Sequence, residues 1–373
     1  MSVLLIILGF LFFVGLVIVH EWGHFIAARR AGVEVEEFGV GFPPKVWGKQ
    51  IKTKKSKFLL SINLLPLGGF VRLKGENDAA TSQGSYGVAS LKDKTKIMVA
   101  GVGMNLLAAY VLLVIVALIG MPQIVPDQFG VARDSKVTRQ VENKGKVTVA
   151  RVVGGSPAEK AGINRGDLVQ LINGNKITSP TQVSDITKEY AGRAVEIKLQ
   201  RGNEVLVKTV QLNKVNTGDG FLGVSGQSDQ KGVELRRSTW SAPIVAAGVL
   251  KQFTVLTFNG LGSIVSNVFS GHASKAGDQV AGPVGIAVVI KEGSKIGVQF
   301  ILMIIAIISL SLAIMNILPI PALDGGRLFV TYLFRLNNWK LTKEKESVIH
   351  GAGFAFLMTL FVLITVLDVK RFF

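Results

Sequence analysis

The sequence predicts a polytopic α-helical membrane protein with about four transmembrane helices, a membrane-associated β-hairpin and an inserted extracytoplasmic α+β domain. Hydrophobic residues make up 49% of the 373 residues, and the mean hydropathy of +0.43 is high for a soluble protein. The apolar residues are concentrated in blocks, and each block can supply the roughly 20 residues that cross the hydrocarbon core of a bilayer. A long polar stretch separates the second block from the third.

Four blocks are predicted to span the membrane, and charged residues are nearly absent from their centres. The first block lacks the basic leading region and the small-residue cleavage pattern of a signal peptide, so we expect it to remain as a helix. The predicted order along the chain is a first span at 1–31, a cytoplasmic-side loop at 32–95, a second span at 96–121, the inserted domain at 127–230, a membrane-associated region at 231–295, a third span at 296–326, a cytoplasmic loop at 327–346, and a fourth span with the C-terminus at 347–373.

Two polar stretches carry the predicted strands. Within the first, Lys57–Lys74 is apolar but interrupted by Pro66, Gly68 and Gly69, which predicts two short strands around a glycine-rich turn that dips into the membrane. Within the second, strands are predicted at Val147–Val153, Asp167–Ile172, Val195–Gln200 and Val205–Gln211, with helices after Ser156 and at Gln182–Tyr190. This order predicts a small sandwich with two helices.

Metal-ligating side chains occur at the end of the first span, in His20-Glu21-Trp22-Gly23-His24. Two histidines four residues apart in a helix project from one face, and Glu21 lies beside them. This spacing supplies zinc-dependent proteases with two ligands and a general base. A chance match is the alternative, but ionisable groups in a spanning helix cost about 2.5–3.5 kcal/mol each. The position therefore favours a zinc site.

A third protein ligand is expected, because catalytic zinc takes three protein ligands and leaves one position open. Asp324 is the candidate, after a third span that Pro319 and Pro321 interrupt and before Gly325-Gly326, which permit a tight turn. By itself this carboxylate is equally well explained as a helix-end residue in headgroup water. Together with the two histidines, it predicts one Zn²⁺ per chain.

The same pairing constrains the topology. With four spans, His20–His24 and Asp324 reach the same side of the membrane, whereas a fifth span at Trp240–Phe269 would separate them. We therefore expect Trp240–Phe269 to lie on the membrane as an amphipathic helix. The side that holds 30–95 and 327–346 is rich in Lys and Arg, so it is predicted to be cytoplasmic. The net charge of +17 indicates orientation and contact with anionic lipid, and we expect no nucleic-acid partner.

Seven segments together resemble the site-2 protease family of intramembrane metalloproteases, in its bacterial RseP-type branch with a single PDZ domain. The resemblance runs nearly end to end. The segments are His20–His24, Phe38–Phe42, Pro66–Val71, Gly101–Asn105, a PDZ-like domain with its Ser156-Pro157-Ala158 turn, Gly282–Ile286, and Asn316–Gly326. The better-known proteobacterial members carry two PDZ domains, whereas one is found here.

The resemblance implies roles for particular residues and partners. His20, His24 and Asp324 bind zinc, Glu21 activates water, Asn105 and Asn316 line the substrate path, and Gly68, Gly69, Phe70 and Val71 pair with an extended substrate. Phe221, Leu222, Gly223 and Val224 resemble a PDZ carboxylate-binding loop, which either binds peptide termini or belongs to a size filter. The implied protein is a monomer of the bacterial inner membrane that cuts single-pass membrane proteins, such as anti-sigma factors, and signal-peptide remnants.

Two rival interpretations remain at this point. A non-catalytic PDZ-containing membrane scaffold has no need of three zinc ligands together with Glu21. A zinc transporter or sensor would usually show internal repeats, and none is found. His272 and His350 belong to no ligand pattern and are interpreted as interfacial or capping histidines.

Overall fold

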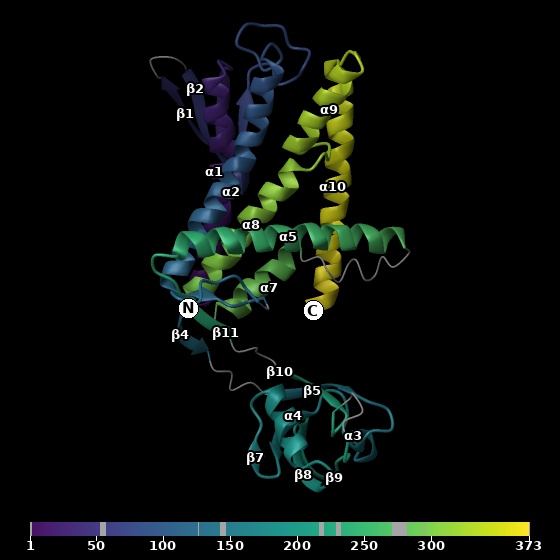
Figure 1. Cartoon of the computed structure of the whole chain (residues 1–373). Coiled ribbons are helices and arrows are strands. Elements are labelled where there is room, and N and C mark those ends of the chain that lie inside the picture. Colours follow the sequence, from purple (N-terminus) through teal and green to yellow (C-terminus); the bar gives the residue numbers. More distant parts are fainter. Residues whose placement is uncertain are drawn as a thin grey trace. The chain divides into compact units, whose positions relative to one another are not determined.

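The computed structural model describes residues 2–52, 57–125, 127–141, 147–215, 220–228, 233–270, 282–294 and 296–372. The chain divides into two compact units (Figure 1). The first comprises residues 1–138 and 236–373, and the second comprises residues 139–235. His272, one of the two histidines without a predicted ligand pattern, lies outside the described residues.

Five described helices are long and apolar enough to cross a membrane: α1 (Ser2–Arg30), α2 (Leu91–Ile119), α5 (Ala242–Phe269), α8 (Val298–Ile317) and α10 (Lys343–Phe372). Side chains from α2, α5 and α8 form one apolar core, which includes Leu113, Val116, Val249 and Leu310. A second cluster packs Leu16 of α1 against Ile301 and Ile305 of α8. The first unit is therefore a helical bundle in which α8 lies inside.

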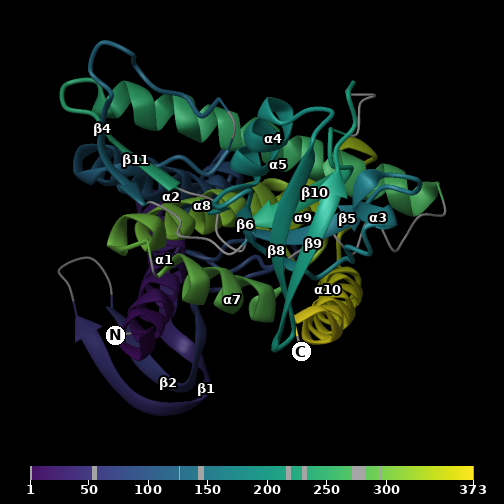
Figure 2. The ribbon, with the colours of Figure 1, turned by 90° about the horizontal axis from the view of Figure 1, so that it is seen from below.

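Helix α5 runs across the direction of α2 and α10 in both views (Figures 1 and 2). Its buried residues, among them Ala242, Val249 and Phe253, all belong to its first half and lie on one face at helical spacing. In its second half, Phe258 and Phe269 are exposed. The length and composition of α5 satisfy the requirement for a span, but its crosswise direction favours a position along the membrane surface.

Several helices extend beyond the predicted spans or lie outside them. Helix α2 begins at Leu91 instead of 96, because the Ser90 hydroxyl accepts a hydrogen bond from the Asp93 backbone and caps the helix. Part of the predicted loop 327–346 is helical, since α9 (Asp324–Leu336) follows α8 after a short break, and α10 already begins at Lys343. A short helix, α7 (Pro283–Gly293), precedes α8.

The two short strands predicted around the glycine-rich turn in Lys57–Lys74 pair with an earlier segment of the chain, and do not pair with each other as a hairpin. Strand β2 (Lys57–Leu73) pairs with β1 (Val35–Lys52) along both of its arms. Residues 37–40 of β1 pair with residues 59–62 on one side and with 69–72 on the other. Because β1 supplies the central arm, the arm at 69–73 has one edge that β1 does not pair. Pairing between distant segments is not encoded in local alternation, so the sequence did not reveal it.

The second unit contains a six-stranded sheet in the order β10-β5-β6-β8-β9, with β7 paired to β6. The strands are β5 (Val147–Val152), β6 (Leu168–Ile172), β7 (Asn175–Lys176), β8 (Ala194–Arg201), β9 (Glu204–Gln211) and β10 (Val224–Ser228), and the helices are α3 (Pro157–Lys160) and α4 (Pro180–Glu189). The sequence predicted a sandwich of two sheets, whereas these strands form one sheet around a core that includes Val149, Ile172 and Ile197. Strands β3 (Met121–Pro122), β11 (Val233–Arg237) and β4 (Lys136–Val141) form a separate three-stranded sheet.

Candidate metal centre

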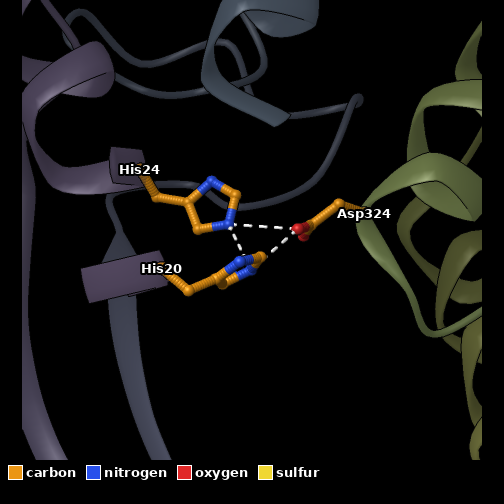
Figure 3. A group of neighbouring side chains, drawn as sticks. All are labelled: His20, His24 and Asp324. Atoms are coloured by element: carbon orange, nitrogen blue, oxygen red, sulfur yellow. Dashed lines mark hydrogen bonds and ion pairs between the residues drawn. The ribbon is translucent and has the colours of Figure 1, made fainter. Parts of the chain in front are cut away.

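Helix α1 supplies two of the three candidate ligands. His20 and His24 lie one turn apart on one face, and they are buried, with 8% and 7% of their surface exposed. The apolar sequence before them forms a long uninterrupted helix, so the spacing of the two imidazoles is fixed by helix geometry. Figure 3 shows both rings directed toward Asp324.

The third candidate ligand, Asp324, is positioned by a turn between α8 and α9. Helix α8 ends at Ile317, and Asp324 is the first residue of α9. The turn is tight because the following glycines leave room for it. A Cβ added to Gly325 would lie 2.3 Å from the Ile317 carbonyl oxygen, and one added to Gly326 would lie 1.9 Å from that of Ile320. Only glycine fits at these two positions.

The three side chains converge on one point (Figure 3). Asp324 Oδ2 lies 3.1 Å from His20 Nε2 and 3.1 Å from His24 Nε2, and the two Nε2 atoms lie 3.1 Å apart. Ligands bonded at 2.0–2.1 Å around tetrahedral zinc lie about 3.3 Å from one another. The two nitrogens and one oxygen therefore fit a zinc ion with a fourth position open.

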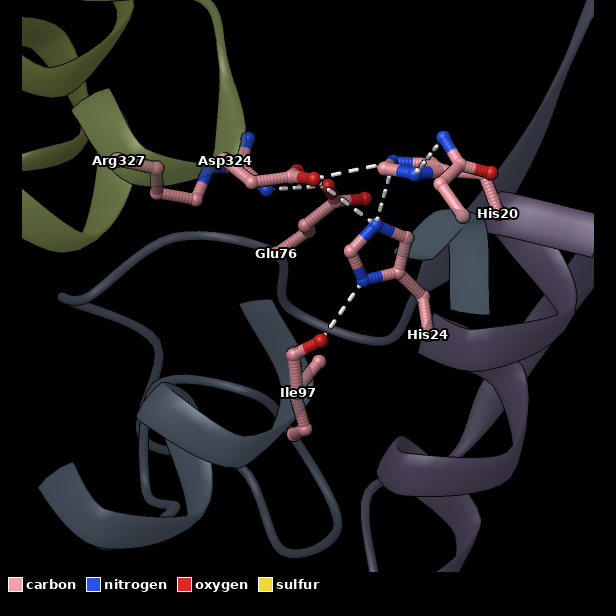
Figure 4. A network of polar contacts seen from close by, with 7 residues as sticks. His20, His24, Glu76, Ile97, Asp324 and Arg327 are labelled. Carbon is pink, nitrogen blue, oxygen red and sulfur yellow. Dashed lines mark hydrogen bonds and ion pairs between the residues drawn. The ribbon is translucent and has the colours of Figure 1, made fainter. Parts of the chain in front are cut away.

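The outer ring nitrogens show how the imidazoles are oriented (Figure 4). His24 Nδ1 donates to the Ile97 carbonyl oxygen at 2.8 Å, which leaves the Nε2 lone pair for a metal. His20 Nδ1 lies 3.2 Å from the Asn105 amide nitrogen, while Asn105 Oδ1 is buried without a partner. With the amide oxygen and nitrogen exchanged, Oδ1 accepts from the Nδ1 hydrogen of His20, and Nε2 keeps its lone pair for a metal. Asn105 thus fixes the ligating tautomer of His20.

Helix α2 approaches the two ligands closely at Gly101. A Cβ added at this position would lie 2.5 Å from His24 Nε2 and 2.8 Å from His20 Nε2. A side chain here would occupy the place of the metal ligands. The sequence showed this glycine only as part of a family motif, without indicating its contact.

Glu21 and two of the three candidate ligands, His24 and Asp324, line a cavity of about 550 Å³, together with Phe70 and Val71 among others. A Cβ added to Gly69 of β2 would lie 3.4 Å from the Glu21 Cγ atom, and the Val71 backbone hydrogen-bonds the Glu21 carboxylate. The glycine-rich arm of β2 therefore lies against the candidate general base.

The two asparagines that were predicted to line the substrate path have different surroundings in the structure. Asn105 is 1% exposed and contacts His20. Asn316 lies in the last turn of α8 and is not among the residues found to line the cavity. Three ionisable residues that the sequence did not assign to the site also line it: Glu76, Arg327 and His350. Arg327 Nη1 donates to Glu76 Oε1 at 2.5 Å, and burial works against the Arg327 charge, but nearby Glu76 raises its pKa (Figure 4).

The predicted PDZ carboxylate-binding loop, Phe221–Val224, precedes and enters β10, an edge strand of its sheet. Leu222 is 3% exposed and packs into the core of the second unit. Gly223 has a φ of 78°, and a Cβ there would lie 2.2 Å from the Ser156 Cβ. The loop is thus packed against the Ser156 turn.

Known proteins are similar to this chain over nearly its whole length. The model of peptidase family M50 matches residues 8–360. A predicted zinc metalloprotease of Clostridium perfringens is 33% identical over 371 residues, 98% of each chain. The zinc metalloprotease RasP of Bacillus licheniformis is 28% identical, over 97% of this chain and 98% of its own. The regulator of sigma-W protease RasP of Bacillus subtilis is 27% identical, over 96% of each chain.

Among solved structures, a PDZ domain of an SdrC-like protein from Listeria monocytogenes is 24% identical, with a TM-score of 0.20, over 25% of this chain and 93% of its own. The family model extends across both histidines and Asp324, and the apolar helices indicate a membrane protein. The chain belongs to peptidase family M50 and is a zinc metalloendopeptidase.

Proposed function

We propose that this enzyme hydrolyses peptide bonds within the transmembrane segments of single-pass membrane proteins. The observation that carries the proposal is the position of the site: His20, Glu21 and His24 belong to an apolar helix long enough to cross a membrane. Hydrolysis needs water, which hydrocarbon excludes, so the reaction requires a protein-lined cavity. The cavity beside Glu21, His24 and Asp324 supplies one.

Different residues of the site bind the metal, orient its ligands and transfer protons. Zinc, when bound, is a Lewis acid that lowers the pKa of a coordinated water to about 7. Glu21 takes a proton from the attacking water and delivers it to the leaving amine. His20, His24 and Asp324 hold the metal, and Asn105 and the Ile97 carbonyl orient the imidazoles.

The arm of β2 at Gly69–Val71 gives the substrate a place to unwind. A helical substrate keeps its carbonyls in hydrogen bonds, so it must become extended before attack. We propose that it pairs with the edge of this arm that β1 leaves unpaired, next to Glu21. Gly68 and Gly69 carry no side chains that would obstruct a second strand there.

The proposed topology has four spans, α1, α2, α8 and α10, with α5 on the membrane surface. The metal ligands then lie toward the cytoplasmic side of a bacterial inner membrane, and the PDZ-like domain lies outside. The name of the Bacillus subtilis relative refers to regulation of sigma-W, which supports anti-sigma factors as one substrate class. Signal-peptide remnants are a second, and we propose a monomer as the acting species.

Substitution of Glu21 tests the mechanism. Glu21→Gln is expected to keep one zinc per chain and to lose turnover of a model transmembrane substrate, because the ligands remain and only the base is removed. His20→Ala, His24→Ala and Asp324→Asn are each expected to deplete zinc. Cleavage by Glu21→Gln at the wild-type rate contradicts the proposal. Proteomics of membrane fragments that accumulate with Glu21→Gln would then identify the substrates.

A further inference from the structure

The C-terminal helix α10 contacts the turn that carries Asp324. His350 and Gly353 lie three residues apart on α10, so they share one face of the helix. Each of them meets a neighbouring residue of the segment between α8 and α9. For α10 the sequence had predicted only a membrane span with a capping or interfacial histidine.

The contact of His350 is a hydrogen bond to the backbone of the turn. Its Nδ1 accepts from the Ala322 backbone N–H at 3.0 Å. Ala322 has a φ of 80°, a conformation that residues other than glycine rarely adopt and that needs support from its surroundings. Ala322 stands two residues before the metal ligand Asp324. The hydrogen bond therefore supports a strained turn directly beside the ligand.

One ring nitrogen of His350 is in an unfavourable environment, and no described contact within α10 compensates for it. Because Nδ1 accepts, the ring hydrogen is on Nε2 in the neutral form, and Nε2 is buried without a partner among the described residues. A buried donor without a partner is destabilising, and an apolar residue at this position would avoid that loss. The contact with Ala322 is the interaction that offsets this cost.

The contact of Gly353 is a close backbone approach. A Cβ added here would lie 2.3 Å from the Pro321 carbonyl oxygen and 2.6 Å from the Pro321 carbonyl carbon. From the other direction, Gly325 and Gly326 of α9 meet the carbonyls of Ile317 and Ile320. The turn is thus held between the first residues of α9 and one face of α10, with little room to move.

We infer that His350 and Gly353 are positioning residues for the zinc ligand Asp324. His350 fixes the Ala322 peptide by its hydrogen bond. Gly353, which has no side chain, lets α10 pack directly against the Pro321 carbonyl. Together they set the direction in which α9 begins, and with it the place of the Asp324 carboxylate relative to His20 and His24. The inference depends on the zinc site and is independent of where the substrate is cut.

A matched pair of glycine substitutions tests the close contact between Gly353 and Pro321. Gly353→Ala places a methyl group against the Pro321 carbonyl, whereas Gly351→Ala, on the same helix, meets nothing within 4 Å. Zinc affinity is measured by competition with chelators of graded strength on the purified full chain. We expect Gly353→Ala to weaken zinc binding by about 10–100-fold, as residues supporting metal ligands commonly do. Gly351→Ala is expected to remain within about twofold of wild type.

A second pair tests the hydrogen bond independently. His350→Leu removes the acceptor, whereas His350→Asn places an amide oxygen near the position of Nδ1. We expect His350→Leu to lose zinc affinity like Gly353→Ala and to alter the visible spectrum of the Co²⁺-substituted protein, and we expect His350→Asn to restore both. Thermal unfolding of the zinc-free variants is expected to match the wild type. Unchanged zinc affinity in both Gly353→Ala and His350→Leu, or equal losses in Gly351→Ala, would overturn the inference.

Discussion

Single residues behind the ligands decide whether the imidazoles can bind zinc. His20 and His24 each use one ring nitrogen for the metal and the other for a hydrogen bond to α2. For His24 the partner is a backbone carbonyl, which a substitution cannot remove. For His20 it is the Asn105 side chain, whose own backbone carbonyl accepts from Ser309 Oγ at 2.8 Å. A substitution of Asn105 can therefore remove the hydrogen bond that orients the His20 ring.

Asn105→Ala is expected to lower zinc affinity by about 10–100-fold, because His20 loses the acceptor that fixes its tautomer. Chelator competition on the purified protein measures this change. Asn259→Ala, at an exposed position of α5, is the control and is expected to have no effect. If Asn105→Ala retains zinc as wild type does but raises the KM for substrate, Asn105 lines the substrate path instead.

At the scale of elements, the crossing of α1 and α2 brings the ligands against a helix backbone. A Cβ added to Gly23 would lie 2.5 Å from the Ala100 carbonyl oxygen, and Gly101 approaches both histidines from the other helix. Small residues on both sides allow the two backbones to approach closely, as in other packed membrane helices. The metal site therefore depends on this helix crossing.

Gly101→Ala is expected to reduce zinc content at least about tenfold, since its methyl group displaces both Nε2 atoms. Gly103→Ala, on the same helix, meets nothing within 4 Å and serves as the matched control. Elemental analysis of the purified proteins gives the zinc content. Equal zinc in the two variants would contradict the close approach of α2.

The PDZ-like domain contains an ion pair with a predictable pH dependence. Asp167 accepts from Arg201 Nε at 2.7 Å and from Arg201 Nη2 at 2.8 Å. Burial raises the pKa of Asp167, but the Arg201 hydrogen bonds outweigh it and the pKa lies below its ordinary value. A lowered folded-state pKa stabilises the domain above the unfolded pKa of about 3.9. This stabilisation is lost as the pH falls through the folded-state pKa.

Asp167→Asn is expected to destabilise the domain by about 1–2 kcal/mol at pH 7, a modest amount because Arg201 is partly exposed. The difference between variant and wild type is expected to shrink below pH 4. Both the loss at pH 7 and its decrease below pH 4 are measured by unfolding the full chain with a denaturant. Proteolytic cleavage within residues 147–215 reports the unfolded fraction. A difference that stays constant down to pH 2 would show that the ion pair is not its source.

For the whole molecule, the sidedness of the loops distinguishes four spans from five. The chain contains no cysteine, so single cysteines report their side without background. Asn338→Cys is expected to react only with a reagent that reaches the cytoplasm, and Asn203→Cys with an impermeant reagent outside. Asn259→Cys in α5 is expected to react from outside, because the proposed topology places α5 on the outer membrane surface. Protection of Asn259→Cys together with cytoplasmic labelling of Asn203→Cys would require a different topology.

The PDZ-like domain is expected to act mainly through its bulk. Strands β4 and β11 are neighbours in one sheet, so a short linker can replace residues 142–232, which lie between them. This deletion is expected to let substrates with long ectodomains be cut without prior trimming, as measured with paired long and short model substrates. A Gly223 substitution is unsuitable for the comparison, because its side chain meets Ser156. Loss of cleavage of short substrates on deletion would identify the domain as a recognition module.

The sequence by itself determined the long apolar helices, the shared face of His20 and His24, and most strands of the PDZ-like domain. These features follow from hydropathy and periodicity over a few adjacent residues. It also predicted Asp324 as the third ligand, since a zinc site needs one and the broken third span ends there.

Only the tertiary structure decided what surrounds these ligands. Asn105 supports His20 across 85 residues of chain, and His350 supports Ala322 across 28. Gly101 fits against both imidazoles, and β1 lies between two arms of β2. Such contacts join segments that are distant in the sequence. They arise from the packing of whole elements, which no local pattern of residues records.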